Sequence, residues 1–155
     1  MAGGVAAVMS QEAGAGSVGL AAADELLEVV SLRRKQSGST QTSLLGEELS
    51  ALYALFDKKA RQSLRIVEQG AVTRYRATQS GRCAFRVKAK GPSDSYLCFP
   101  RHFCSCHSFL YDVVSKEDAF MCKHQLAARI AEATGSCKTV EVSDLPLANF
   151  IQTSL

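Results

Sequence analysis

The chain has 155 residues, of which 46% are hydrophobic and 21% charged, and its formal net charge is +3. These values are typical of one compact soluble domain with some loose terminus, and they exclude a disordered chain. No apolar run is long enough to cross a bilayer, and the first 24 residues contain neither Lys nor Arg, which argues against a secretory signal or an Arg-rich transit peptide. We therefore expect a reducing compartment, where the six cysteines are metal ligands or buried thiols and not disulfides.

The N-terminal part of the chain changes composition twice. Residues 1–22 are mostly Ala, Gly, Val and Ser with little periodicity, which predicts a flexible leader. Asp24 then caps a short amphipathic helix, and residues 36–42 form a linker rich in Gln, Ser, Gly and Thr. The predicted division is a flexible leader with a short helix at 1–42 and a single domain at 43–155.

Four more helices are expected from apolar periodicity and from their end signals. Ser43 opens a helix with apolar residues three and four apart, and Asp57 begins a second that ends at Gly70. Near the C-terminus, a helix covers about 123–134 and is stopped by Gly135, and Ser143 caps a last short helix.

Between these helices the period changes to two, which predicts a β-hairpin. Its strands are Val72–Ala77 and Cys83–Ala89, and we expect a three-residue loop with Gly81 in a left-handed conformation. This register sets Tyr75 opposite Val87 and gives one apolar face. The four basic residues that it gathers on one face are Arg74, Arg76, Arg86 and Lys88.

The region after the hairpin contains two closely spaced dyads of metal-binding residues. The sequence reads Cys104-Ser105-Cys106, then fifteen residues, then Cys122-Lys123-His124. Residues i and i+2 of an extended strand point the same way, so Cys104 and Cys106 can hold one ion, with Cys122 just before a helix and His124 in its first turn. Three thiolates and one imidazole are a common tetrahedral set for structural Zn²⁺. The sequence therefore predicts one zinc site, over which the fifteen-residue connector folds as a short helical cover.

The remaining cysteines and histidines are not expected to bind the metal. Cys83, Cys98 and Cys137 are interpreted as small core residues. His107 is adjacent to Cys106 and sterically awkward as a ligand, and His102 has no partner at a suitable spacing.

The pattern C-x-C, fifteen residues, C-x-H is similar to that of the SWIM zinc finger family, and the Ala-rich helix after His124 extends the likeness. A preceding helix, a basic hairpin and a short tail helix after Val142-Ser143-Asp144 resemble the small SWIM-domain proteins of the Shu recombination complex. The likeness covers roughly residues 44–150, and residues 1–40 share nothing recognisable. One departure is His107, where relatives often have Pro.

With this resemblance, the predicted fold class is α+β: N-terminal helices, a small antiparallel sheet made of the hairpin and a third strand at Tyr96–Phe99, a ββα-like SWIM finger with its core at about 96–134, and C-terminal helices. The resemblance implies a non-catalytic, nuclear partner of a recombinase paralogue with a RecA fold. Together the two assist assembly of the recombinase filament on single-stranded DNA. The SWIM module is then required for folding and for holding the partner, and no membrane partner is expected.

Basic residues are concentrated before the finger. Residues 58–90 contain ten Lys or Arg and one acidic residue, a balance of +9, whereas the rest of the chain has eight basic and fourteen acidic residues, a balance of −6. Like charges opposed across a hairpin destabilise it, and a phosphate backbone would compensate them. The alternative is a solvated face that protects the sheet. We expect weak, salt-sensitive contact with single-stranded DNA and no reading of base sequence.

Catalysis is not expected. Cys106 with His107, or Cys122 with His124, resembles a nucleophile pair, but metal-bound thiolates are poor nucleophiles and no third orienting residue can be named. The chain has neither a phosphate-binding glycine loop nor the glutamate of a zinc deaminase signature. A different function remains open from the sequence: a generic SWIM zinc-finger adaptor or DNA-binding module in transcription or ubiquitin-ligase complexes.

Overall fold

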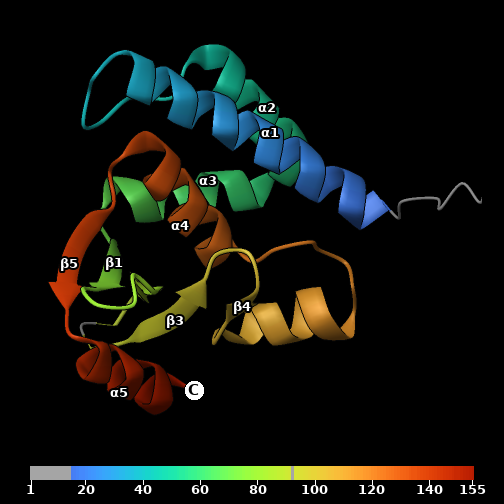
Figure 1. Cartoon of the computed structure of the whole chain (residues 1–155). Coiled ribbons are helices and arrows are strands. Elements are labelled where there is room, and N and C mark those ends of the chain that lie inside the picture. The colour runs from blue at the N-terminus through green and yellow to red at the C-terminus, as the bar shows by residue number, and fades with distance from the viewer. Residues whose placement is uncertain (1–14, 92) are drawn as a thin grey trace, which may run out of the picture.

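The structure, a computed structural model, describes residues 15–91 and 93–155. It has the predicted α+β fold, in which helices cover both faces of a five-stranded mixed sheet (Figure 1). None of the described helices is long and apolar enough to cross a membrane. The helices are α1 (Ala15–Gln36), α2 (Gly46–Phe56), α3 (Lys58–Glu68), the π-helix η1 (Phe109–Ser115), α4 (Lys123–Thr134) and α5 (Asp144–Ser154), and the strands are β1 (Val72–Ala77), β2 (Cys83–Lys88), β3 (Ser95–Phe99), β4 (Phe103–Cys104) and β5 (Lys138–Val142).

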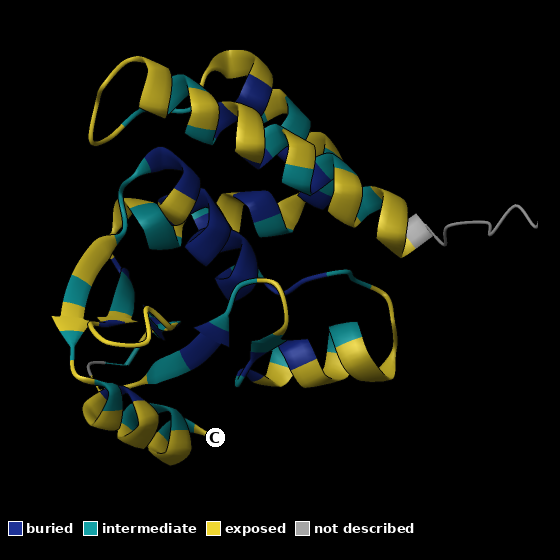
Figure 2. Cartoon of the chain, in the orientation of Figure 1, coloured by how far each residue is buried: buried dark blue, intermediate teal, exposed yellow. Residues whose placement is uncertain are grey.

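Helix α4 is the centre of the molecule. Ten of its twelve residues are buried, because α1 and α3 pack on one side of it and the sheet on the other (Figure 2). Its small side chains Ala127, Ala128 and Ala131 let it approach the sheet closely, and its larger ones, Leu126 and Ile130, fill the space among the helices. The predicted helix and its stop at Gly135, which has a left-handed φ of 75°, are confirmed.

Helix α1 corrects the prediction of a leader that is flexible to residue 22. The helix begins at Ala15, nine residues before the expected cap at Asp24, and the other predicted leader residues, 1–14, lie outside the described part of the chain. Ala23, Leu27 and Val30 are buried in the core that α1 shares with α2, α3 and α4. Burial of this face against α4 stabilises a helix that the Gly- and Ala-rich composition does not signal.

Helix α2 begins at Gly46, three residues after the predicted start at Ser43. The Leu45 N–H, which has no main-chain partner within the helix, donates to the carboxylate of Glu48 (2.7 Å). The same carboxylate accepts from Arg33 of α1 (2.8 Å), and Arg33 also donates to the Ser43 carbonyl. These bonds hold residues 43–45 against α1 as extended chain.

The sheet has the strand order β4-β3-β2-β1-β5, with β5 parallel to β1 and the other pairs antiparallel. The third strand is confirmed, but β4 and β5 were not predicted. Strand β5 is a short run directly after α4, and only its pairing with β1, 61 or more residues away in the sequence, distinguishes it from a loop.

The predicted hairpin register is wrong. Tyr75 pairs with Ala84, not with Val87, because the Ala77 N–H bonds the Arg82 carbonyl (2.8 Å) and closes a four-residue loop. Gly81 has the expected left-handed φ of 69° within this loop. The extra loop residue changes the pairing by an odd number of residues, which exchanges the two faces of one strand relative to the other.

The observed register separates the four basic hairpin residues. Arg74 and Arg76 share the α4 face with Phe85 and Val87, whereas Arg86 and Lys88 lie on the opposite face. The observed register buries apolar side chains on both faces of the sheet. The α4 face has those of β1, β2 and β3, and the opposite face packs against α5. The apolar residues between the sheet and α5 are Tyr75, Ala77, Ala84, Leu97, Phe99, Val142, Leu147, Phe150 and Ile151.

Candidate metal centre

Two elements bring the predicted ligands together at one end of α4. Cys104 ends β4 and Cys106 follows two residues later, while Cys122 is the N-cap of α4 and His124 lies in its first turn. All four side chains are buried, and one ligand atom from each lies within 4.8 Å of the others. The predicted placement of the four residues is what the structure has, and they form a candidate metal site.

Main-chain amides support two of the sulfur atoms. The Phe109 N–H donates to Cys106 Sγ (3.3 Å), and the Gln125 N–H donates to Cys122 Sγ (3.4 Å). Gln125 returns the bond through its side-chain oxygen, which accepts from the Cys122 N–H (3.0 Å). Cys122 therefore caps α4 with its sulfur in a capping box, where the positive end of the helix dipole favours a thiolate.

His124, the fourth candidate ligand, has a buried ring nitrogen, Nδ1, without a hydrogen-bond partner in the described part of the chain. Its ring packs on Tyr96, with ring centroids 4.6 Å apart, which fixes the imidazole beside the sulfur atoms. An unpaired buried ring nitrogen next to three thiols fits a bound metal cation, and this set of donors suits Zn²⁺.

The three thiols differ in how readily they ionise. Hydrogen bonds from the Cys104 and Cys122 thiols, with one from the Phe109 amide, lower the pKa of Cys106. Donating to Cys106 raises the pKa of Cys104, and contacts with Cys104 and Cys106 raise that of Cys122. The protein alone therefore favours one thiolate, and ionising all three requires a compensating positive charge.

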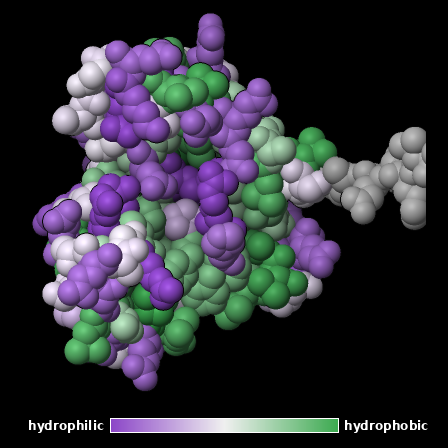
Figure 3. Space-filling view, in the orientation of Figure 1, coloured by the Kyte–Doolittle hydropathy of each residue, from purple (hydrophilic) through white to green (hydrophobic). Residues whose placement is uncertain are grey.

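The connector between the two dyads forms the expected helical cover. Helix η1 begins at Phe109, which is buried and packs edge-on against Phe103 with ring centroids 5.6 Å apart. The outer side of η1 exposes about half of Leu110, Tyr111 and Val114, and hydrophobic residues gather there in Figure 3. The metal site is therefore directly linked to an apolar surface.

The other candidate residues divide as follows. Cys98 is fully buried and opposite Cys104 in the sheet, as expected of a core residue. Cys83 and Cys137 are half-buried and line a cleft. Cys137 packs against the core cluster between α4 and the sheet, as expected, whereas the interpretation of Cys83 as a core residue is wrong. Both are on the sheet face that α4 leaves partly uncovered. His107 is exposed and stacks on Tyr111, outside the ligand cluster.

Sequence reasoning missed an ionic cluster built from three distant segments. Arg129 of α4 and Arg101 of the loop between β3 and β4 both bond the carboxylate of Asp24 in α1. These residues have no common spacing or motif. Only the packing of α1 on α4 brings them together, so no local signal could have identified them.

The fold and the buried Cys₃His cluster, with its C-x-C and C-x-H spacing, define a protein of the SWIM zinc-finger type. Three relatives bear the name zinc finger SWIM domain-containing protein 7. The Danio rerio protein is 36% identical over 104 residues (66% of this chain and 73% of that protein), the Homo sapiens protein 33% over 106 residues (68% and 74%), and the Dictyostelium discoideum homologue 32% over 108 residues (68% and 69%). The chain belongs to the family of zinc finger SWIM domain-containing protein 7. No family model matches the sequence, and no solved structure matches the chain.

Proposed function

We propose that the protein is a non-catalytic, zinc-binding subunit of a nuclear recombination-mediator complex of the Shu type. In this role it assists assembly of a recombinase filament on single-stranded DNA during homologous recombination and DNA repair. The observation that carries the proposal is a closed four-ligand site attached directly to an exposed apolar helix. The sequence resemblance to Shu-complex SWIM proteins supplies the recombination context.

The ligand set supports a structural zinc ion. Four protein ligands complete a tetrahedron, so no coordination position is left for water or substrate. The ligands come from a strand and from a helix N-terminus that are separate in the sequence, and one ion would fix them together. When bound, Zn²⁺ supplies the positive charge that allows the three sulfur atoms to ionise, and its binding free energy adds to that of folding.

The same geometry supports a role without catalysis. Cys104, Cys106 and Cys122 are buried, so their sulfur atoms are not accessible from the surface. The exposed His107 stacks on Tyr111 and lies outside the ligand cluster, so it does not pair with Cys106 as a base would with a nucleophile. A site closed in this way serves to hold the elements around it.

The outer face of η1 is the surface that we assign to the partner. Leu110, Tyr111 and Val114 are large apolar or aromatic residues with about half of their surface exposed. Phe109, at the start of the same helix, bonds Cys106 through its amide and packs in the core. Metal binding therefore positions this surface, and we expect a RecA-fold subunit to cover it.

Co-purification with partner identification tests the proposal. Tagged full-length chain is isolated from cells, bound proteins are identified by mass spectrometry, and zinc is measured on the same sample. We expect about one zinc per chain and a RecA-fold partner that Val114→Asp removes. Leu145→Asp, which changes a still more exposed apolar residue on α5 (71% against 55% for Val114), is the control and should retain the partner.

Three outcomes contradict the proposal. A transposase-like or ubiquitin-ligase partner would instead support the adaptor function. Equal loss of the partner in the Val114 and Leu145 variants would remove η1 as the specific surface. Wild-type protein that is folded and free of zinc would reject the structural metal.

A further inference from the structure

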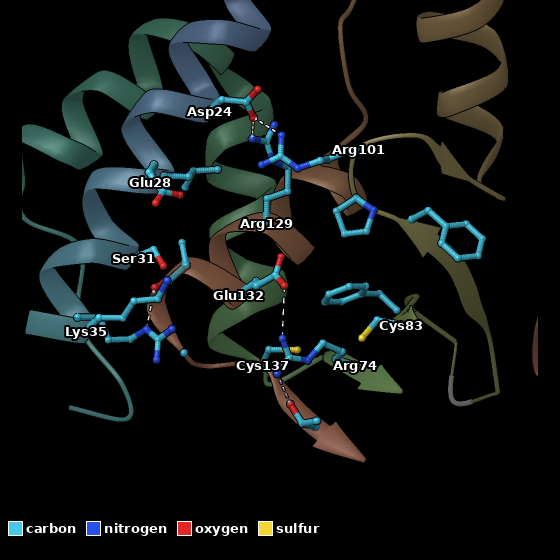
Figure 4. A pocket seen from close by; sticks show the side chains of 18 of the residues that line it. Asp24, Glu28, Ser31, Lys35, Arg74, Cys83, Arg101, Arg129, Glu132 and Cys137 are labelled. Carbon is cyan, nitrogen blue, oxygen red and sulfur yellow. Dashed lines mark hydrogen bonds and ion pairs between the residues drawn. The ribbon is translucent and has the colours of Figure 1, made fainter. Parts of the chain in front are cut away.

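A cleft of about 640 Å³ lies between α1, α4 and the edge of the sheet, away from the metal site (Figure 4). Arg101 and Arg129 enter it from the loop after β3 and from α4, and both guanidinium groups point at Asp24. The side chain of Arg129 is only 6% exposed, whereas that of Arg101 is 62% exposed. One wall of the cleft therefore has a buried arginine behind an accessible one.

The ionic pairing on this wall is incomplete. Two arginines share the single carboxylate of Asp24, which leaves an excess positive charge. Of the nitrogens of Arg129, only Nη2 is bonded within residues 15–91 and 93–155. Burial is the largest influence on Arg129 and lowers its pKa, and Asp24 only partly opposes this effect. An anion that entered the cleft would find free donors on both guanidinium groups.

Further cations line the cleft. Arg34 donates only to main-chain carbonyls, at Ala133 (3.0 Å) and Thr40 (3.3 Å), so its charge has no carboxylate partner among the described residues. Arg74 bonds Glu132 (3.3 Å), but its Nε is buried without a hydrogen-bond partner in the described chain. With Lys35, the lining has five Lys or Arg residues against the three acids Asp24, Glu28 and Glu132. The cleft is therefore positively charged overall.

The lining also includes apolar residues. Phe99 and Pro100 are half-buried, whereas Phe85 is only 4% exposed. Arg74 connects the cleft to β1 and so to the basic segment of residues 58–90. A single-stranded nucleic acid fits this lining, since its phosphates require cations and its bases can pack on the partly exposed Phe99 and Pro100. An acidic or phosphorylated peptide would use the cations alone.

We propose that this cleft binds the phosphate backbone of single-stranded nucleic acid, with Arg101 and Arg129 as the main phosphate donors. A phosphate takes the free guanidinium donors of both residues and competes with Asp24 for them. The choice of nucleic acid as ligand rests on the proposed function, whereas phosphate binding by the cleft is measured without it.

The test uses the full-length, zinc-loaded chain and a fluorescein-labelled oligothymidylate of about 20 nucleotides, followed by fluorescence anisotropy over a salt series. We expect wild-type binding at low salt that weakens steeply as salt is added. Arg101→Glu should weaken it about tenfold or more and reduce the salt slope by about one, and Arg101→Lys should restore part of the affinity. Arg61→Glu is the matched control on α3, exposed and outside the cleft, and should change affinity less than about twofold.

A second measurement maps the site without a variant that could fail to fold. Cys83 and Cys137 line the cleft, so bound oligonucleotide should slow their alkylation, quantified by mass spectrometry. Equal labelling with and without oligonucleotide would overturn the assignment. So would an absence of wild-type binding at low salt, equal effects of Arg101→Glu and Arg61→Glu, or a larger loss with Arg86→Glu on the α5 face of the hairpin.

Two further outcomes separate this inference from the proposed function. A phosphoserine peptide that bound more tightly than the oligonucleotide would retain the phosphate chemistry but overturn the nucleic-acid assignment. If Arg101→Glu abolished DNA binding while no RecA-fold partner co-purified, the cleft assignment would stand and the proposed function would fail. The reverse result would reject the cleft alone.

Discussion

Cys98 and Cys122 are buried cysteines beside the candidate ligand Cys104, and a comparison of the two tests the metal site directly. Both are almost fully inaccessible, at 0% and 1% exposure, and both belong to the core cluster between α4 and the sheet. Only Cys122 belongs to the group of four candidate ligands. Replacing each with Ala removes one sulfur atom from the same core, so the packing loss is matched. Cys122→Ala also removes the sulfur cap of α4, which is worth about 1 kcal/mol, and any larger difference between the variants reports ligation.

The magnitudes expected for the two variants are far apart. Cys98→Ala loses one small buried group, which costs about 1 kcal/mol and lowers Tm by about 2–4 °C in a chain of this size. Cys122→Ala loses a ligand, and structural Zn²⁺ contributes about 10–16 kcal/mol of apparent binding free energy in small zinc-finger peptides. Because a whole domain is stable by only about 5–15 kcal/mol, loss of the ion should unfold the region around α4.

The assay is zinc content by elemental mass spectrometry with urea unfolding on the same preparations. We expect Cys98→Ala to keep about one zinc and a cooperative transition, and Cys122→Ala to lose both. Equal zinc content and equal unfolding midpoints in the two variants would refute the reasoning. A Cys98→Ala protein that lost its zinc would show that the ligand set is assigned incorrectly.

Three further predictions concern the rest of the fold. Gly135→Ala should destabilise the protein by more than the roughly 1 kcal/mol expected for Gly81→Ala. Both glycines have positive φ, but only at Gly135 would a Cβ overlap a main-chain carbonyl of the α1–α2 loop. Similar unfolding midpoints for the two variants would contradict this. Glu48→Ala should cost about 1–3 kcal/mol in urea unfolding, because it leaves the partly buried Arg33 and one helix-start amide without their acceptor; a change below about 0.5 kcal/mol would show that water replaces these bonds. Burial raises the pKa of Cys137 from near 9 to about 11. Its alkylation at pH 8 should therefore be about 100-fold slower than that of free cysteine, and the rate should rise about tenfold per pH unit up to about pH 11. A rate that levelled off near pH 9 would contradict the shift.

The candidate metal site could be predicted from the sequence because the geometry of its four residues is set locally. Each dyad is a C-x-C or C-x-H unit whose geometry depends on one strand end or one helix start. Gly81 and Gly135 were predictable for the same reason, since each marks a left-handed position required by a loop or a helix end. Such features need no knowledge of how distant segments pack.

The errors all concern long-range packing. The hairpin register depends on which face α4 covers, and the sequence does not show that Phe85 faces α4 while Ala84 faces α5. Strand β5 exists through its pairing with β1. The early part of α1 is mostly exposed and extends the part of the helix that is buried from Ala23 onward, so it has no buried apolar stripe to produce a recognisable period.

Helix α4 joins the candidate metal site to the cleft that we propose for phosphate. Cys122 and His124 are at its start, and Arg129 is seven residues after Cys122, about two turns along the helix. Because nearly the whole helix is buried, its position is set jointly by the metal ligands, by the sheet and by α1. The Asp24–Arg129 ion pair then fixes α1, which forms one wall of the cleft. Ligation of the four residues at the start of α4 would therefore act on the cleft arginine as well as on η1, the two surfaces that we propose for partners.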